Sequence, residues 1–127
     1  MSAELYYVYD FYDRFDVPIR QTPTIPPKNE IELRIKLLRE EVDELEKALY
    51  NGDKVNVLQE LTDIQYVLCG TYLTCGMQDL YYTAFDRVHE SNMSKLWPDG
   101  TPHYNEYGKV INPPGYKSVD LSDLIKE

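Results

Sequence analysis

Five acidic side chains fall in two short stretches of the chain, and both stretches have helical spacing. The five are three of the acids in "LLREEVDELEKAL" and both acids in "LQELTDIQYVL": Glu40, Glu41, Glu44, Glu60 and Asp63. Residues three or four apart lie on one face of a helix, so each stretch gathers its carboxylates on one face. Like charges at this spacing weaken an isolated helix by a few tenths of a kcal/mol per pair. Either both faces are exposed to water, as most charged faces are, or a cation lies between them.

The connection between the two stretches favours the cation. The segment "YNGDKVN" is short enough to fold two helices into an antiparallel hairpin, which brings the two acidic faces together at one height. Basic partners within the helices are few, with only Arg39 and Lys47 in the first stretch and none in the second. Mg²⁺ suits such a junction because it prefers oxygen ligands and keeps open positions for water and phosphate oxygens. The sequence therefore predicts a magnesium site.

Apolar residues at steps of three and four predict the helices that carry these side chains. Asn29 with Glu32 forms a capping box for the second helix, Asp53 is the N-cap of the third, and Gly76 ends the third. The predicted helices cover four ranges: residues 4–15, 31–49, 54–75 and 79–95. The expected fold is all-α, an antiparallel bundle of about four helices.

Beyond Trp97 the sequence is rich in turn formers and has no sustained periodicity. We expect an irregular tail over residues 97–127 after a helical core over residues 4–96, all within a single domain of 127 residues. A short hairpin around Asp99 and Gly100 and a last helical turn at 121–125 are predicted within the tail.

Composition excludes several functions. The net charge is -9, which argues against binding to nucleic acid or to an anionic membrane, and an anionic substrate would need a cation as intermediary. No apolar run approaches the roughly 20 residues that cross a bilayer, and the start has no basic segment leading into an apolar one. A cytoplasmic protein is expected. Cys69 and Cys75 lie on divergent helical faces and are read as buried thiols, without a disulfide or zinc.

The acidic motifs resemble a known family. "EEVDE", followed after fifteen residues by "ELTD", matches the Glu-Glu-x-x-Glu … Glu-x-x-Asp signature of the all-α, MazG-like nucleoside triphosphate pyrophosphohydrolases. The later segments "VHESNMSKLW" and "DGTP…GKVINPPGY" are similar to the compact bacterial and phage members. The resemblance implies hydrolysis of a nucleoside triphosphate between the α and β phosphates, with Mg²⁺ as cofactor and Mn²⁺ able to substitute.

The resemblance also implies residue roles. Glu40 would position or deprotonate the attacking water, and Lys109 is a weaker phosphate contact. Asn92 and Lys95 would contact the sugar or phosphates, although alone they would be read as a helix cap and a cation at a helix end. His89 is a weaker candidate still. Four carboxylates would hold the metal: Glu41, Glu44, Glu60 and Asp63.

The sequence does not determine which nucleotide is the substrate. Tyrosines of the first helix could stack on a base or form core and subunit contacts. Tyr12 and Asp16 stand where relatives often have histidine and glycine, so no base preference transfers. A deoxynucleotide is expected, with dGTP, dCTP and dUTP as candidates. The alternatives are a phosphoribosyl-ATP pyrophosphohydrolase and a noncatalytic acidic helical interaction module. Apolar residues on several helix faces predict a homodimer or homotetramer. If a phage encodes the chain, the expected location is the host cytoplasm.

Overall fold

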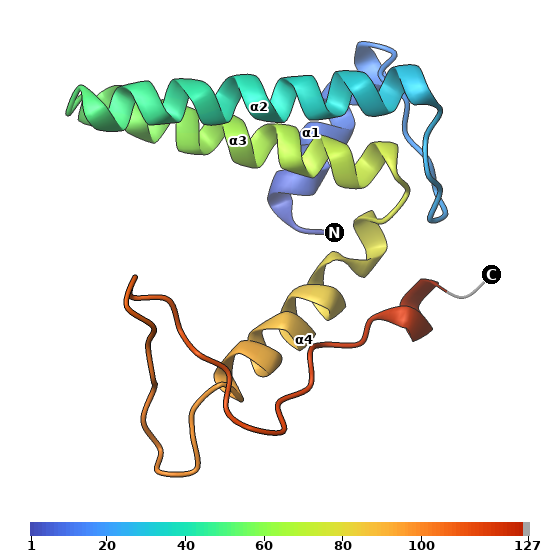
Figure 1. Cartoon of the computed structure of the whole chain (residues 1–127). Coiled ribbons are helices and arrows are strands. Elements are labelled where there is room, and N and C mark those ends of the chain that lie inside the picture. Colours follow the sequence, from blue (N-terminus) through green and yellow to red (C-terminus); the bar gives the residue numbers. More distant parts are fainter. Residues whose placement is uncertain (126–127) are drawn as a thin grey trace. The chain divides into compact units, whose positions relative to one another are not determined.

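The computed structural model describes residues 1–125 and consists of helices joined by turns and a long irregular tail (Figure 1). Within this range no β-strand forms, and the one isolated antiparallel bridge joins Tyr104 to Val110. The all-α prediction is confirmed. There are four α-helices and two short 3₁₀ helices: α1 (Ala3–Arg14), α2 (Lys28–Tyr50), α3 (Lys54–Thr74), η1 (Gln78–Leu80), α4 (Tyr81–Met93) and η2 (Ser122–Ile125).

The chain divides into two compact units. The first, Met1–Asp79, contains α1, α2 and α3, and the second begins at Leu80 with α4 and continues into the tail. A single domain over all 127 residues remains a prediction. No helix among residues 1–125 is long and apolar enough to cross a membrane.

In the first unit, α3 packs against both α2 and α1 (Figure 1). The buried apolar side chains are few and come from all three helices: Leu5, Val8, Tyr12, Ala48, Cys69 and Leu73. Tyr12 reaches over Gly70, where an added Cβ would lie 1.8 Å from the tyrosine hydroxyl. Its hydroxyl accepts a hydrogen bond from the buried guanidinium of Arg34 on α2. One tyrosine of α1 therefore contacts both helices of the acidic pair.

The turn between α2 and α3 follows its predicted chemistry. Asp53 caps α3 by accepting a hydrogen bond from the backbone N–H of Asn56 at 3.2 Å, as predicted, and Gly52 has a φ of 66°. The predicted capping box of α2 is wrong. Pro27 is the N-cap residue and Asn29 is already helical, with no side-chain cap. The φ of a proline is fixed near the value that the start of a helix needs, so the N-cap is Pro27, two residues before the predicted Asn29.

The segment between α1 and α2 is fastened to the end of α3. Arg20 donates to the carbonyl of Thr74 at 2.8 Å, and the Thr74 hydroxyl donates to the carbonyl of Pro18 at 2.9 Å. The guanidinium of Arg20 also forms two hydrogen bonds with Glu30, at 2.8 and 2.9 Å, which lower the pKa of Glu30. Gly76, with a φ of 67°, ends this helix region as predicted.

In the second unit, α4 is shorter than the predicted 79–95 because its first residues form η1 and it ends at Met93. The turn around Gly100 is present, with the N–H of Trp97 donating to the carbonyl of Thr101 at 3.0 Å. The antiparallel bridge, however, encloses residues 105–109, so the predicted hairpin lies a few residues later in the chain. The last helical turn is confirmed as η2, fastened by Arg87 to Asp123 at 2.6 Å.

Candidate metal centre

Carboxylates from two helices meet where α2 and α3 pack against each other. One carboxylate oxygen from each of Glu41, Glu60 and Asp63 lies within 4.8 Å of the other two. Glu44, one turn after Glu41 on α2, is within hydrogen-bonding reach of Glu60. The structure therefore brings together the four side chains that the sequence predicts as metal ligands.

These carboxylates are partly removed from water without being neutralised. Glu60 is only 9% exposed, and Glu41 and Asp63 are half-buried. One oxygen of Glu41 and one of Glu60, the Oε2 atom in each, are buried with no hydrogen-bond partner. Among residues 1–125 none of the four acids forms a salt bridge. Buried acceptors left unpaired cost free energy, and more so when they are charged, so the cluster lacks a positive partner.

The mutual proximity of the acids raises pKa values. The pKa of Glu60 is raised above its ordinary value mainly by a hydrogen bond with Glu41 that favours the protonated form, and then by burial. The pKa of Glu44 is raised by its hydrogen bond with Glu60 and by the charge of that carboxylate. Both shifts come first from hydrogen bonds between neighbouring carboxyl groups, and the charge of the neighbouring acids adds to them.

The donor set fits a hard divalent cation. All the donors are carboxylate oxygens, the ligands of Mg²⁺, Mn²⁺ and Ca²⁺, and within residues 1–125 no nitrogen or sulfur donor joins the cluster. An ion with metal–oxygen distances of about 2.0 to 2.6 Å touches atoms 4 to 5 Å apart when it lies between them. The two unpaired Oε2 atoms would gain the partner that residues 1–125 do not provide.

Gln59 joins this group although the sequence reasoning missed it. Its side-chain amide donates to Oδ1 of Asp63 at 2.9 Å, which fixes the direction of that carboxylate. Gln59 is four residues before Asp63 on the same helix, a spacing at which such pairs contact each other. That spacing was the signal in the sequence that could have identified it.

Glu40 lies outside the cluster. Its side chain is 54% exposed, its Oε1 is 4.0 Å from Nζ of Lys36, and it lines a surface hollow with Arg39 and Asp43. Rotation by about 100° per residue explains the difference from Glu41, which points at α3. Its role as a base remains a prediction.

The predicted substrate contacts belong to the second unit. Asn92 is exposed in the last turn of α4, and the N–H of Lys95 donates to its carbonyl at 3.1 Å. The ammonium of Lys95 is 5.9 Å from the centre of the Tyr116 ring. Lys109 is exposed, and its N–H donates to Oδ1 of Asn105 at 3.0 Å. The structure thus groups Asn92 with Lys95 at one helix end, and their binding roles remain predictions.

The sequence matches a known protein family over the segment that contains the acidic cluster. The family model described as phosphoribosyl-ATP pyrophosphohydrolase matches residues 8–92, about two thirds of the 127 residues. The match covers all four clustered acids, Glu40 and Asn92, and it ends before Lys95. No curated protein matches the chain. The chain belongs to the phosphoribosyl-ATP pyrophosphohydrolase family, within the all-α MazG-like superfamily, and is a hydrolase of phosphoric anhydride bonds.

Proposed function

We propose that the chain is a metal-dependent nucleoside triphosphate pyrophosphohydrolase that releases a monophosphate and pyrophosphate. The observation that carries the proposal is the cluster of half-buried carboxylates on α2 and α3, with two oxygens that have no partner. Family membership supports the reaction class. The proposed substrates are deoxynucleoside triphosphates, with dGTP, dCTP and dUTP as candidates.

The charge of the protein supports a metal requirement. A chain of net charge -9 repels a triphosphate, so it must bind the substrate together with cations. Glu41, Glu60 and Asp63 would hold Mg²⁺ or Mn²⁺, with Glu44 beside them. A bound divalent ion would neutralise negative charge on the phosphates and lower the pKa of a coordinated water.

Glu40 is the proposed base for the attacking water. It is well exposed, and its contact with Lys36 is long, so its carboxylate is free to rotate and accept a proton. Asn92, Lys95 and Lys109 are the proposed contacts of the sugar and phosphates, on the strength of the motif resemblance and their exposed or half-exposed positions.

Phosphoribosyl-ATP is a second candidate substrate. The matching family model bears that name, which favours it at least as strongly as a deoxynucleotide. The bond cleaved is the same, between the α and β phosphates, so the same carboxylates would serve. The two candidates differ only in what the protein must recognise beyond the triphosphate.

A substrate panel tests the proposal. The chain is incubated with Mg²⁺ and each canonical deoxynucleotide, each ribonucleotide or phosphoribosyl-ATP, and the products are separated by chromatography. We expect a monophosphate and pyrophosphate in equal amounts from at least one substrate. Asp63→Asn is the inactive comparison, and Asp79→Asn, an exposed acid outside the cluster, is the matched control. Orthophosphate as the first product, or equal turnover by wild type and Asp63→Asn, would overturn it.

A further inference from the structure

The end of the tail folds back along α4 in the second unit. Arg87 and Ser91 on α4, and Lys95 in the turn that follows it, are separated by steps of four residues, which places them along one side of the helix. Their partners come later in the chain: Ser91 and Lys95 contact Tyr116, and Arg87 contacts Asp123. The tail therefore returns beside α4 in the opposite direction (Figure 1).

A tight turn brings Tyr116 to the helix. The sequence "PPGY" forms this turn, in which the backbone N–H of Tyr116 donates to the carbonyl of Pro113 at 3.1 Å and Gly115 has a φ of 79°. Proline in the second position and glycine with a positive φ in the third are the pattern of a type II turn. Proline fixes its own φ and glycine adopts a positive φ without strain. The turn is therefore a stiff support for the tyrosine that ends it.

Two contacts fix the ring of Tyr116. Its hydroxyl shares a hydrogen bond with the hydroxyl of Ser91. The ammonium of Lys95 lies over the ring, 5.9 Å from its centre, which is within the range of a cation–π interaction. Both Tyr116 and Lys95 are half-buried. Because the hydroxyl is bonded to α4 and the face of the ring contacts the lysine, the ring restricts the positions open to the ammonium.

A second attachment holds the tail without touching Lys95. The guanidinium of Arg87 forms two hydrogen bonds with the carboxylate of Asp123, at 2.6 and 2.9 Å, and a third with the carbonyl of Asp120 at 3.3 Å. Arg87 and Lys95 are eight residues apart, about 12 Å along the helix axis. The segment after Tyr116 is therefore fastened to α4 two turns away from the lysine.

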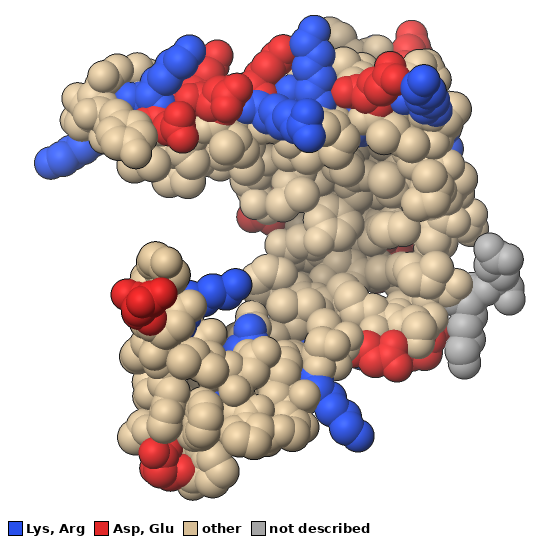
Figure 2. All heavy atoms as spheres, in the orientation of Figure 1, with Lys and Arg blue, Asp and Glu red and all other residues tan. Residues whose placement is uncertain are grey.

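Lys95 differs from two lysines of α2 in having no acidic partner. Lys28 and Lys36 lie 3.8 and 4.0 Å from carboxylate oxygens of Glu32 and Glu40, and Figure 2 shows acidic and basic side chains next to each other along that helix. Among residues 1–125 Lys95 forms no salt bridge. A carboxylate would compete with a phosphate for the ammonium, whereas the face of an aromatic ring attracts a cation without neutralising it. The ammonium of Lys95 is therefore restricted in position and still available to an anion.

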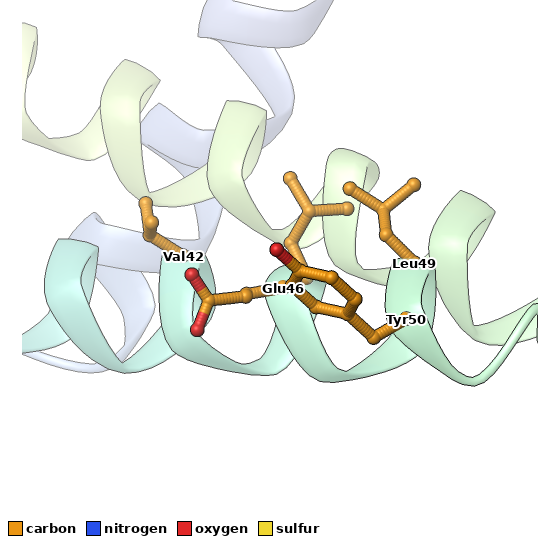
Figure 3. A pocket seen from close by; sticks show the side chains of 5 residues that line it. Val42, Glu46, Leu49 and Tyr50 are labelled. Carbon is orange, nitrogen blue, oxygen red and sulfur yellow. The ribbon is translucent and has the colours of Figure 1, made fainter.

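A tyrosine that lines a hollow is not by itself a place for phosphate, as the end of α2 shows. Tyr50 lines a hollow there with Val42, Leu45 and Leu49, and the charged side chain beside them is Glu46 (Figure 3). Within the described residues no lysine or arginine lines this hollow. Its carboxylate would repel a phosphate, so the pairing of a tyrosine with an unneutralised lysine is what distinguishes the end of α4.

We propose that Tyr116 is a positioning residue for phosphate binding, which holds the ammonium of Lys95 where it meets the phosphates of the substrate. This role rests on the proposed function, in which Lys95 contacts the phosphates. A lysine side chain loses rotamer freedom when it binds a ligand, and a ring that restricts it beforehand reduces that loss. Tyr116 itself touches no substrate, and its whole effect passes through Lys95.

Calorimetry of the full chain with inorganic triphosphate and Mg²⁺ tests the proposal. Tyr116→Leu removes the ring, and we expect the affinity to fall about fivefold. Tyr116→Phe keeps the ring and removes only the hydroxyl, so the loss should be about twofold. Tyr107→Leu is the matched control, since Tyr107 is another tyrosine of the tail and is 86% exposed, and it should bind like wild type. A wild type that binds no triphosphate, or Tyr116→Leu that binds as tightly as wild type, would overturn the proposal.

A double substitution separates positioning from general support of the fold. Lys95→Met removes the cation and should weaken triphosphate binding by about tenfold or more. Adding Tyr116→Leu to Lys95→Met should then change nothing, because the ring acts through the lysine. A further loss of about fivefold in the double variant would show that the tyrosine acts in another way, and the proposal would fail.

A nuclear magnetic resonance spectrum of wild type decides the case in which Tyr116→Leu loses its helical circular dichroism. The ring current of Tyr116 should move the ε-methylene resonance of Lys95 upfield, and triphosphate with Mg²⁺ should perturb the same resonance. Lys95→Met identifies that resonance by its disappearance. A lysine resonance at its ordinary position, or one that triphosphate leaves unchanged, would contradict the proposal.

Turnover distinguishes this proposal from the proposed function. In the active chain, Tyr116→Leu should raise KM about fivefold and leave kcat nearly unchanged, the pattern of lost ground-state binding. A wild type that binds triphosphate but cleaves no nucleotide would overturn the proposed function and leave the role of Tyr116 in place. A wild type that cleaves a nucleotide with a KM that Tyr116→Leu does not change would overturn the role of Tyr116 alone.

Discussion

The α2–α3 helix pair carries two kinds of incompletely satisfied group. One carboxylate oxygen of Glu41 and one of Glu60 are buried and accept no hydrogen bond, whereas aliphatic side chains of the same helices, such as Val42 and Leu61, are about half exposed to water. A buried charge without a partner costs more free energy than a half-exposed apolar side chain, so the acidic cluster is where a bound ligand would add most to stability. Variants of acids inside and outside the cluster test this difference.

The largest effect is expected from removing one charge in the acidic cluster. Glu41→Gln or Asp63→Asn keeps the size of the side chain but removes a metal ligand, so we expect kcat/KM to fall on the order of 10³-fold with helical circular dichroism unchanged. Turnover by the substrate panel gives the measurement. Glu32→Gln, an exposed acid elsewhere on α2, should keep wild-type activity.

Metal binding itself should stabilise the folded chain. At a Mg²⁺ concentration 100 times its dissociation constant, the free energy of unfolding should rise by about 2.7 kcal/mol, which raises the thermal midpoint by on the order of 10 °C. Calorimetric scans with and without chelator measure the difference. Equal midpoints in both scans would contradict a cation between α2 and α3.

The metal-free cluster should show its repulsion in a pH series. The folded pKa of Glu60 is raised, so the stability linked to this group is full below the unfolded pKa, near 4.3, and is lost as the pH rises through the folded pKa. In Glu60→Gln the side chain at this position stays uncharged at every pH. In chelator, the midpoint of wild type should therefore fall relative to that of Glu60→Gln as the pH rises, and an unchanging difference would argue against the crowding.

The smallest effect concerns a carboxylate that the chain does satisfy. The two hydrogen bonds from Arg20 lower the pKa of Glu30, so its stabilising effect is present above the unfolded pKa and is lost as the pH falls through the folded pKa. Glu30→Gln should be less stable than wild type at neutral pH, and the difference should close below about pH 4. Its pH dependence thus has the opposite sign to that of Glu60→Gln.

Sequence spacing predicted the four helices and grouped five acids on two helix faces, because both depend on periodicity within one segment, and the family resemblance singled out four of the five as metal ligands. It did not separate Glu40 from Glu41, since both lie near Glu44 on the helix and only the direction of α3 distinguishes them. The capping box failed because Pro27 already supplies a helix entry, and local preferences of Asn29 could not compete. The hairpin of the tail was displaced because the turn at Gly100 closes only between Trp97 and Thr101, while the antiparallel bridge joins Tyr104 to Val110 around the next turn.

Tyr12 of α1 contacts both helices that carry the acidic cluster. Its ring fills the space left by Gly70 on α3, and its hydroxyl accepts a hydrogen bond from Arg34, a buried cation of α2. Detachment of α1 would leave that guanidinium without its partner seven residues from a metal ligand. Slow amide exchange in α1 and in the first half of α2 should therefore occur in one cooperative opening. Detachment of α1 should then also weaken metal binding by the carboxylates of α2 and α3.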